Sequence, residues 1–264
     1  MNMHATRIAE AAALLWQCWR DSRRIATLPE RCRPAGRAEG YAIQAEIARL
    51  SGQRVLGWKI AATSAAGQRH IHVDGPLAGR LLARYTVPAG GSVSLSGNLM
   101  RVGEAEFAFR MGKPLPPREA PYARDEVMEA VRSLHPALEF PDTRFADCAA
   151  VGAAQLIADN ACAGGFVLGA ATGDAWRKRD LAGHAVAAMR DGSLACEGRG
   201  ANVLGDPRLA LAWIANELRS LGAGLEAGDV VTTGTCVVPF AIAPGERIRA
   251  DFGELGSVEA ALTD

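Results

Sequence analysis

The sequence predicts an α+β fold in which a helical N-terminal part precedes a β-rich body. Two patterns support this prediction. Apolar residues recur at helical spacing over residues 5–24 and about 38–50, whereas from Val55 onward short apolar runs alternate with turn signals, as is typical of strands. A chain of 264 residues with 49% hydrophobic residues can also bury a substantial core. We therefore expect a helical region at 1–54 and a β-rich region at 55–264, either as two units or as one continuous domain.

The first helix is expected to be amphipathic. Ile8, Ala11, Leu15 and Trp19 fall on one helical face, and arginines near residue 24 favour a helix C-terminus there. Because such a face must be covered, we expect it to pack against the body of the protein or against a neighbouring subunit.

Within the β-rich body, two helical stretches are expected to interrupt the strands, at about 124–134 and about 147–158. Towards the C-terminus, turns with glycine or proline separate three strand-like runs, at 230–235, 247–252 and 258–262. The body should therefore consist mainly of short strands.

Charge and cysteine content narrow the classes of partner. The formal net charge is zero, so the chain shows no electrostatic footprint for nucleic acid or for an anionic membrane, and a small-molecule partner is expected. Six cysteines occur without C-x-x-C spacing, which argues against a zinc knuckle and against a disulfide scaffold. The apolar run at 11–16 is too short to span a membrane. We expect a cytoplasmic protein.

Three glutamates are the candidate metal ligands. Glu104 and Glu106 are two residues apart in a strand-like segment, so their carboxylates should share one face, ~7 Å apart at the backbone. Apolar residues surround them, and Glu139 lies in another apolar run, between prolines. Buried carboxylates need a cation, a cationic partner or a shared proton, and three of them suit Mg²⁺ or Mn²⁺. The alternative is a solvated strand face.

Other polar residues have an ordinary structural interpretation as well as a functional one. Lys59, in an apolar segment, is typical of a lysine whose stem lies along apolar surface while its ammonium reaches water. Asn160 follows a helical stretch and precedes glycines, as expected of a helix cap. Gly234 indicates either close approach of the backbone to a ligand or a β-bulge. For His70 and His72, surface or supporting positions are expected.

Several segments, taken in order, resemble one family. They are Gly57–Ser64, Val73–Pro76 with Gly79, Val102–Phe109, Pro136–Glu139, Ala158–Ala161 with Gly164–Gly169, Gly228–Gly234, and Pro244–Gly245. Together they are similar to the 2-keto-4-pentenoate hydratase and 2-oxo-3-enedioate decarboxylase group of the fumarylacetoacetate hydrolase superfamily. The resemblance covers most of the chain from about residue 40.

The resemblance implies a helical N-terminal part followed by a mixed β-sandwich roll, which would be the metal-binding catalytic domain. It also implies a homo-oligomer, a divalent metal and a 2-oxo acid substrate. The residues that it assigns are Glu104, Glu106 and Glu139 as metal ligands, Lys59 as the catalytic residue, and Asn160 as a substrate-binding residue. Gly234 and Thr235 are expected to bind substrate as well, because the backbone at this glycine is thin enough to approach a ligand.

Two departures from the family pattern affect the expected reaction. Leu77 stands where many members have an aspartate with an acid–base role, and Cys162 stands where serine is common. The expected activity is a hydratase that adds water to a 2-hydroxy-2,4-dienoate in aromatic catabolism. A 2-oxo-3-enedioate decarboxylase of the 4-oxalocrotonate type is the close alternative. A non-catalytic homologue that binds a 2-oxo acid stays open as a third.

Overall fold

The computed structural model describes residues 3–264 and confirms the α+β class. The α-helices in this range are α1 (Met3–Arg20), α2 (Arg37–Ser51), α3 (Ala65–His70), α4 (Arg124–Glu129), α5 (Gly152–Ala158) and α6 (Pro207–Ser220). The strands are β1 (Val55–Ala61), β2 (Leu77–Leu82), β3 (Thr86–Pro88), β4 (Ser92–Ser94), β5 (Val102–Met111), β6 (Val131–Phe140), β7 (Gly165–Leu168), β8 (Ala185–Arg190), β9 (Ser193–Arg199), β10 (Val230–Thr235), β11 (Phe240–Ala241), β12 (Arg247–Asp251) and β13 (Ser257–Thr263).

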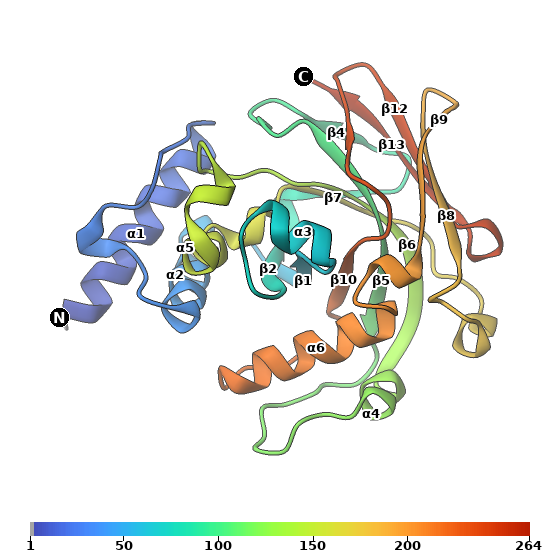
Figure 1. Cartoon of the computed structure of the whole chain (residues 1–264), viewed down its shortest axis with the longest axis horizontal. Helices are drawn as coiled ribbons and strands as arrows, with labels where there is room; N and C mark the ends of the chain where they lie inside the picture. The colour runs from blue at the N-terminus through green and yellow to red at the C-terminus, as the bar shows by residue number, and fades with distance from the viewer. Residues whose placement is uncertain (1–2) are drawn as a thin grey trace.

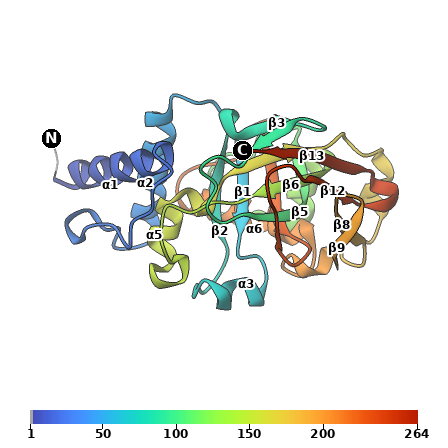
Figure 2. The same cartoon turned by 90° about the horizontal axis from the view of Figure 1, so that it is seen from above.

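The strands form two sheets. The larger is mixed, with the order β2-β1-β10-β5-β6-β7-β3 and with β11 paired to the start of β5; the smaller has the order β4-β13-β12-β8-β9. Figure 1 shows α1, α2 and α5 gathered at one end of the molecule and the smaller sheet at the other, and Figure 2 shows the same separation from above. The long pair β5–β6 runs through the middle and joins the two parts.

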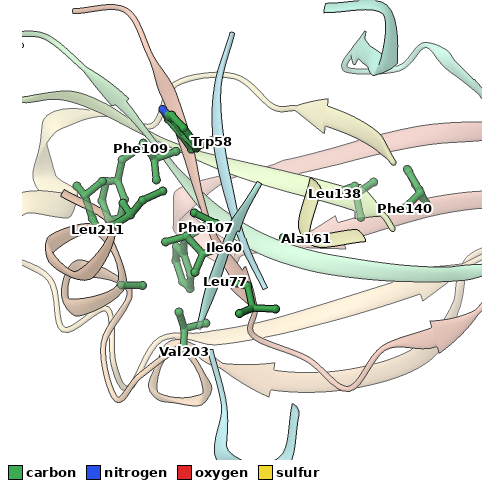
Figure 3. Close-up of a cluster of buried hydrophobic side chains, with 14 of the residues drawn as sticks. Trp58, Ile60, Leu77, Phe107, Phe109, Leu138, Phe140, Ala161, Val203 and Leu211 are labelled. Carbon is green, nitrogen blue, oxygen red and sulfur yellow. The ribbon is translucent and has the colours of Figure 1, made fainter. Parts of the chain in front are cut away.

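The main core lies between the two sheets and α6. Phe107 of β5 meets Phe252 edge to face at 4.9 Å between ring centroids, and Phe109 packs against Trp176 at 5.8 Å. Leu211 of α6 belongs to the same cluster (Figure 3). Since side chains alternate along a strand, this packing leaves the even-numbered residues of β5 to face the other side of the larger sheet.

A second, smaller apolar cluster occupies that other side. Its buried members are Leu81, Ala108, Ala137, Phe166 and Val230. Ala108 follows Glu106 on the same face of β5, and Ala137 is the cross-strand partner of Glu106. The carboxylate of Glu106 therefore lies next to a layer of buried apolar side chains on this face of the sheet.

Three local predictions need correction, and one helix was missed. The N-terminal helix ends at Arg20 and not near residue 24. The stretch at 124–134 is helical only to Glu129, because Leu134 instead pairs with Phe109 in the β5–β6 ladder. The stretch at 147–158 is broken into a 3₁₀ turn and α5. Helix α6 was not predicted, although Asp206 caps it by accepting from the Arg208 amide at 2.8 Å and Pro207 occupies its first position.

The N-terminal helices pack onto the sheet rather than standing apart from it. Gln44 of α2 is buried and donates from its side-chain amide to the carbonyls of Ala78 in β2, at 2.8 Å, and Ile157 in α5, at 2.9 Å. The division at residue 54 into two units stays a prediction. Among residues 3–264, no helix is both long enough and apolar enough to cross a lipid bilayer.

Candidate metal centre and active site

The structure brings Glu104, Glu106 and Glu139 together. The antiparallel register of β5 and β6 places Glu104 directly opposite Glu139, and Glu106 lies two residues further along the same face. One carboxylate oxygen from each residue lies within 4.8 Å of the other two. Glu106 is 0% exposed and Glu139 is 1% exposed, which excludes the solvated strand face. Glu104 is only half-buried, so the cluster faces solvent from its side.

Burial and mutual repulsion raise the pKa values of this cluster. Burial, then the neighbouring Glu139 carboxylate, raise the pKa of Glu104 to about 7, although the Lys59 ammonium opposes the shift. Burial also raises the pKa of Glu106 well above its usual range, with further contributions from Glu139 and Glu104. In the absence of a cation the cluster therefore retains protons at a pH where ordinary carboxyl groups are ionised.

The oxygens of the cluster fit a hard divalent cation. Among the described residues, neither oxygen of Glu139 and only one oxygen of Glu106 has a hydrogen-bond partner. Buried carboxylate oxygens normally accept hydrogen bonds, so these oxygens without one are unusual. A set of carboxylate oxygens is what Mg²⁺, Mn²⁺ or Ca²⁺ prefers. The cluster could therefore hold a divalent metal.

Lys59 is buried beside the glutamates. It is 2% exposed, which excludes the surface-lysine interpretation. Its Nζ lies 3.0 Å from Glu139 Oε1, as an ion pair without hydrogen-bond alignment, and donates to the Ala161 carbonyl at 3.0 Å. Burial alone would lower the pKa of the ammonium, but the three carboxylates outweigh it and raise the pKa. Lys59 is thus held in its charged form.

The carbonyl that accepts from Lys59 belongs to an unusual turn. Asn160, Ala161 and Cys162 all have φ between 49° and 58°, a left-handed conformation that costs roughly 1–2 kcal/mol per non-glycine residue. The turn packs over β2 at Gly79, where a Cβ atom would lie 2.3 Å from the Asn160 carbonyl oxygen. Only glycine leaves room for this contact.

The side chain of Asn160 fixes this turn. Its Oδ1 accepts from the Arg80 amide at 2.6 Å, and its Nδ2 donates to the Arg80 carbonyl at 2.9 Å. Both ends of the side-chain amide are thus engaged by the backbone of β2. Direct contact between Asn160 and a substrate stays a prediction.

A buried ion pair that the sequence interpretation missed also anchors the turn. Arg144 and Asp159 are 2% and 0% exposed at their side chains and form a salt bridge. Asp159 Oδ2 further accepts from the Thr143 hydroxyl at 2.7 Å and from the Arg144 amide at 3.0 Å. Asp159 lies next to Asn160, where the sequence suggested a helix cap, and no pattern in the sequence pairs it with Arg144.

The remaining predicted residues lie around the cluster in different ways. The Gly234 amide donates to Glu106 Oε2 at 2.9 Å, whereas the Thr235 hydroxyl donates to the Val237 carbonyl within its own loop. Gly234 has φ of 92°, and a Cβ atom there would lie 2.1 Å from the Thr63 hydroxyl oxygen. Leu77 is completely buried.

His70 and His72 are exposed, as expected, and His72 Nδ1 lies 3.1 Å from the Ala149 carbonyl oxygen.

Two surface cavities lie elsewhere. One, of about 820 Å³, is lined by residues of the smaller sheet such as Met189 and Arg249; the other, of about 330 Å³, lies beside Trp176 and Arg208. Neither is lined by Lys59 or the glutamates.

The raised pKa values predict how the metal-free protein responds to pH. Between about pH 4.5 and pH 7 the folded cluster binds protons that the unfolded chain has released, so the free energy of unfolding should fall as pH rises through this range. Melting curves in chelator from about pH 5 to pH 8 test this. The double variant Glu104→Gln, Glu106→Gln should lose this part of the slope. An equal slope in both proteins would mean that the cluster does not titrate as described.

Comparisons with known proteins agree with this fold. The family model described as fumarylacetoacetate (FAA) hydrolase C-terminal matches residues 83–263. A 2-keto-4-pentenoate hydratase of Burkholderia vietnamiensis is 34% identical over 97% of this chain and 98% of that protein, and a 4-oxalocrotonate decarboxylase of a Pseudomonas species is 32% identical over 83% and 86%. The solved 4-oxalocrotonate decarboxylase of Pseudomonas putida G7, complexed with magnesium and adipate, superposes with a TM-score of 0.88 at 27% identity and covers 98% of each chain.

Both the sequence match and the superposition extend over nearly the whole chain, and so include the N-terminal helices that the family model does not span. The chain belongs to the fumarylacetoacetate hydrolase C-terminal family.

Proposed function

We propose that the protein is a divalent-metal-dependent hydratase that converts a 2-hydroxy-2,4-dienoate, of the 2-keto-4-pentenoate type, into a 4-hydroxy-2-oxo acid. The observation that best supports this is the cluster of three glutamates, two of them fully buried, beside one buried lysine, in a chain 34% identical to a 2-keto-4-pentenoate hydratase. We further propose Mg²⁺ or Mn²⁺ as the cation, a homo-oligomeric state and a cytoplasmic location. Aromatic catabolism is the setting in which such dienoates arise.

In this proposal Glu104, Glu106 and Glu139 hold the cation, which when bound supplies positive charge for the carboxylate and 2-oxygen of the substrate. Lys59 lies 3.0 Å from Glu139 and carries a proton in the metal-free cluster. A cation held by the glutamates would offset their negative charge and lower the pKa of the ammonium, which is proposed to give its proton to C5 of the dienol. The amine that remains can accept the proton of the 2-hydroxyl group. The product of this step is a 2-oxo-3-enoate.

Water then adds across that product, with oxygen bonding to C4 and a proton to C3. The apolar layer around Ala108 and Phe166 excludes bulk water from the inner side of the site, which strengthens electrostatic interactions there. Gly234 and Thr235 are proposed to contact the substrate where β10 bulges beside Glu106.

A decarboxylase acting on a 2-oxo-3-enedioate is the second candidate. It is favoured by the whole-chain superposition on a solved 4-oxalocrotonate decarboxylase and by Leu77, which offers no carboxylate for acid–base help in hydration. Loss of carbon dioxide would draw on the same positive charge at the 2-oxygen, so the glutamates and Lys59 do not separate the two reactions.

Turnover assays separate them. We expect 2-hydroxypenta-2,4-dienoate, or a 5-substituted relative, to lose its ultraviolet absorbance only when protein and Mg²⁺ or Mn²⁺ are both present, because hydration destroys the conjugated dienol. Release of carbon dioxide from a 2-oxo-3-enedioate would instead indicate the decarboxylase. Absence of turnover with either substrate class, with metal binding confirmed by calorimetry, would leave the non-catalytic homologue.

A further inference from the structure

The left-handed turn at Asn160–Cys162 is the feature of the fold that most needs an explanation. Three consecutive non-glycine residues adopt φ between 49° and 58°. Even a single L-amino acid with a side chain rarely adopts a positive φ. Such strain persists only where the surrounding structure imposes it, and it clusters at functional sites. Its direct consequence here is that the Ala161 carbonyl points at Lys59 Nζ, 3.0 Å away.

The guanidinium group of Arg144 holds the Asn160–Cys162 turn in its left-handed conformation through contacts with the residues on either side of it. It pairs with the Asp159 carboxylate and also donates to two backbone carbonyls that bracket the turn, those of Asp159 and, at 3.1 Å, Ala163. A lysine ammonium could replace the charge but not this planar fork of donors. Arg144 therefore holds both ends of the turn at once.

Arg144 is in turn covered by the N-terminal helix. Its guanidinium carbon lies 4.0 Å from the centre of the Trp19 ring of α1, and that ring stacks on Tyr85 at 4.9 Å. This arrangement favours the flat guanidinium in one orientation. A continuous series of contacts thus runs from Trp19 through Arg144 and the turn to Lys59.

We propose that Arg144, Asp159 and Trp19 are positioning residues for Lys59. Through Trp19, helix α1 would then contribute to the geometry of the active site. This inference rests on the proposed function of Lys59. The three residues act by fixing the Ala161 carbonyl, which sets where the Lys59 ammonium stands relative to Glu139. Without them the lysine would remain present but would be free to take other positions.

The test compares Asp159→Asn, Arg144→Lys and Trp19→Leu with two matched controls. Arg208→Lys makes the same change in an arginine that pairs with Asp206 and donates to two backbone carbonyls, but lies outside the turn. Trp213→Leu replaces a partly buried tryptophan of α6. We expect the three positioning variants to lower kcat by ~10-fold or more with little change in KM or in calorimetric affinity for Mg²⁺, since a small misplacement of a catalytic group has effects of this size. The controls should keep wild-type kcat.

A second readout does not depend on turnover. Lys59 is 2% exposed, so acetic anhydride should modify it slowly in the wild-type protein with Mg²⁺ present, and faster in the positioning variants, as measured by mass spectrometry of the peptide that contains it. If Asp159→Asn does not fold, Arg144→Lys and Trp19→Leu decide the matter. Wild-type rates of acetylation and turnover in these two variants would overturn the inference. An inactive wild-type protein would instead refute the proposed function and leave the acetylation result to stand by itself.

Discussion

Replacing Lys59 with methionine is expected to lower turnover by ~10² or more while the protein remains folded and binds metal, because the substitution keeps the apolar stem and removes only the group that can move a proton. The effect should appear in kcat at saturating metal. Steady-state kinetics on the dienoate, with metal affinity measured by calorimetry, provide the test.

Lys113→Met is the matched control, since Lys113 is one of the chain's exposed lysines and lies away from the glutamates on the strand-to-loop segment after β5. Near-normal kinetics for Lys59→Met would show that its burial beside Glu139 has no catalytic purpose. Equal losses in both variants would point to an effect unrelated to the site.

Glu104→Gln is expected to separate the stability of the metal-free protein from its response to metal. Without metal, the substitution removes one of three repelling carboxyl groups, so the melting temperature should rise or stay the same. With metal at a hundredfold excess over Kd, binding stabilises the wild-type fold by about 2.7 kcal/mol, and the variant should lose most of that gain.

Thermal melts of both proteins, each in chelator and in Mg²⁺ or Mn²⁺, measure these effects. Glu197→Gln on the exposed strand β9 is the control and should respond to metal as the wild-type protein does. If Glu104→Gln also keeps the full metal-induced shift, these glutamates do not form the metal site.

The parts of the fold that follow from local pattern were predictable from the sequence. The C-terminal strand at 230–235 has the predicted limits, and the N-terminal helix has the predicted apolar face, with Ala11 and Leu15 buried. The helical prediction at 124–134 failed after Glu129 because the apolar residues from Val131 onward pack as a strand against β5, a contact distant in sequence. Tertiary pairing there outweighs local helical spacing.

The candidate site was predictable from the sequence where charged residues interrupt otherwise apolar segments. Three carboxylates and a lysine in apolar runs signalled a shared site, and the β5–β6 register brings Glu104 and Glu139 together. Arg144 and Asp159 gave no such signal, because both lie near turns where charged residues are ordinary. The left-handed turn was equally hidden, since Asn160, Ala161 and Cys162 include no glycine to indicate positive φ.

The most direct test is a crystal structure with Mn²⁺ and oxalate, measured at a wavelength where manganese scatters anomalously. We predict one strong anomalous peak bounded by carboxylate oxygens of Glu104, Glu106 and Glu139, with oxalate bound to the same ion and Lys59 beside it. An anomalous peak at any other group of acidic residues would contradict this account. So would oxalate bound far from Lys59 with no ion between the three glutamates.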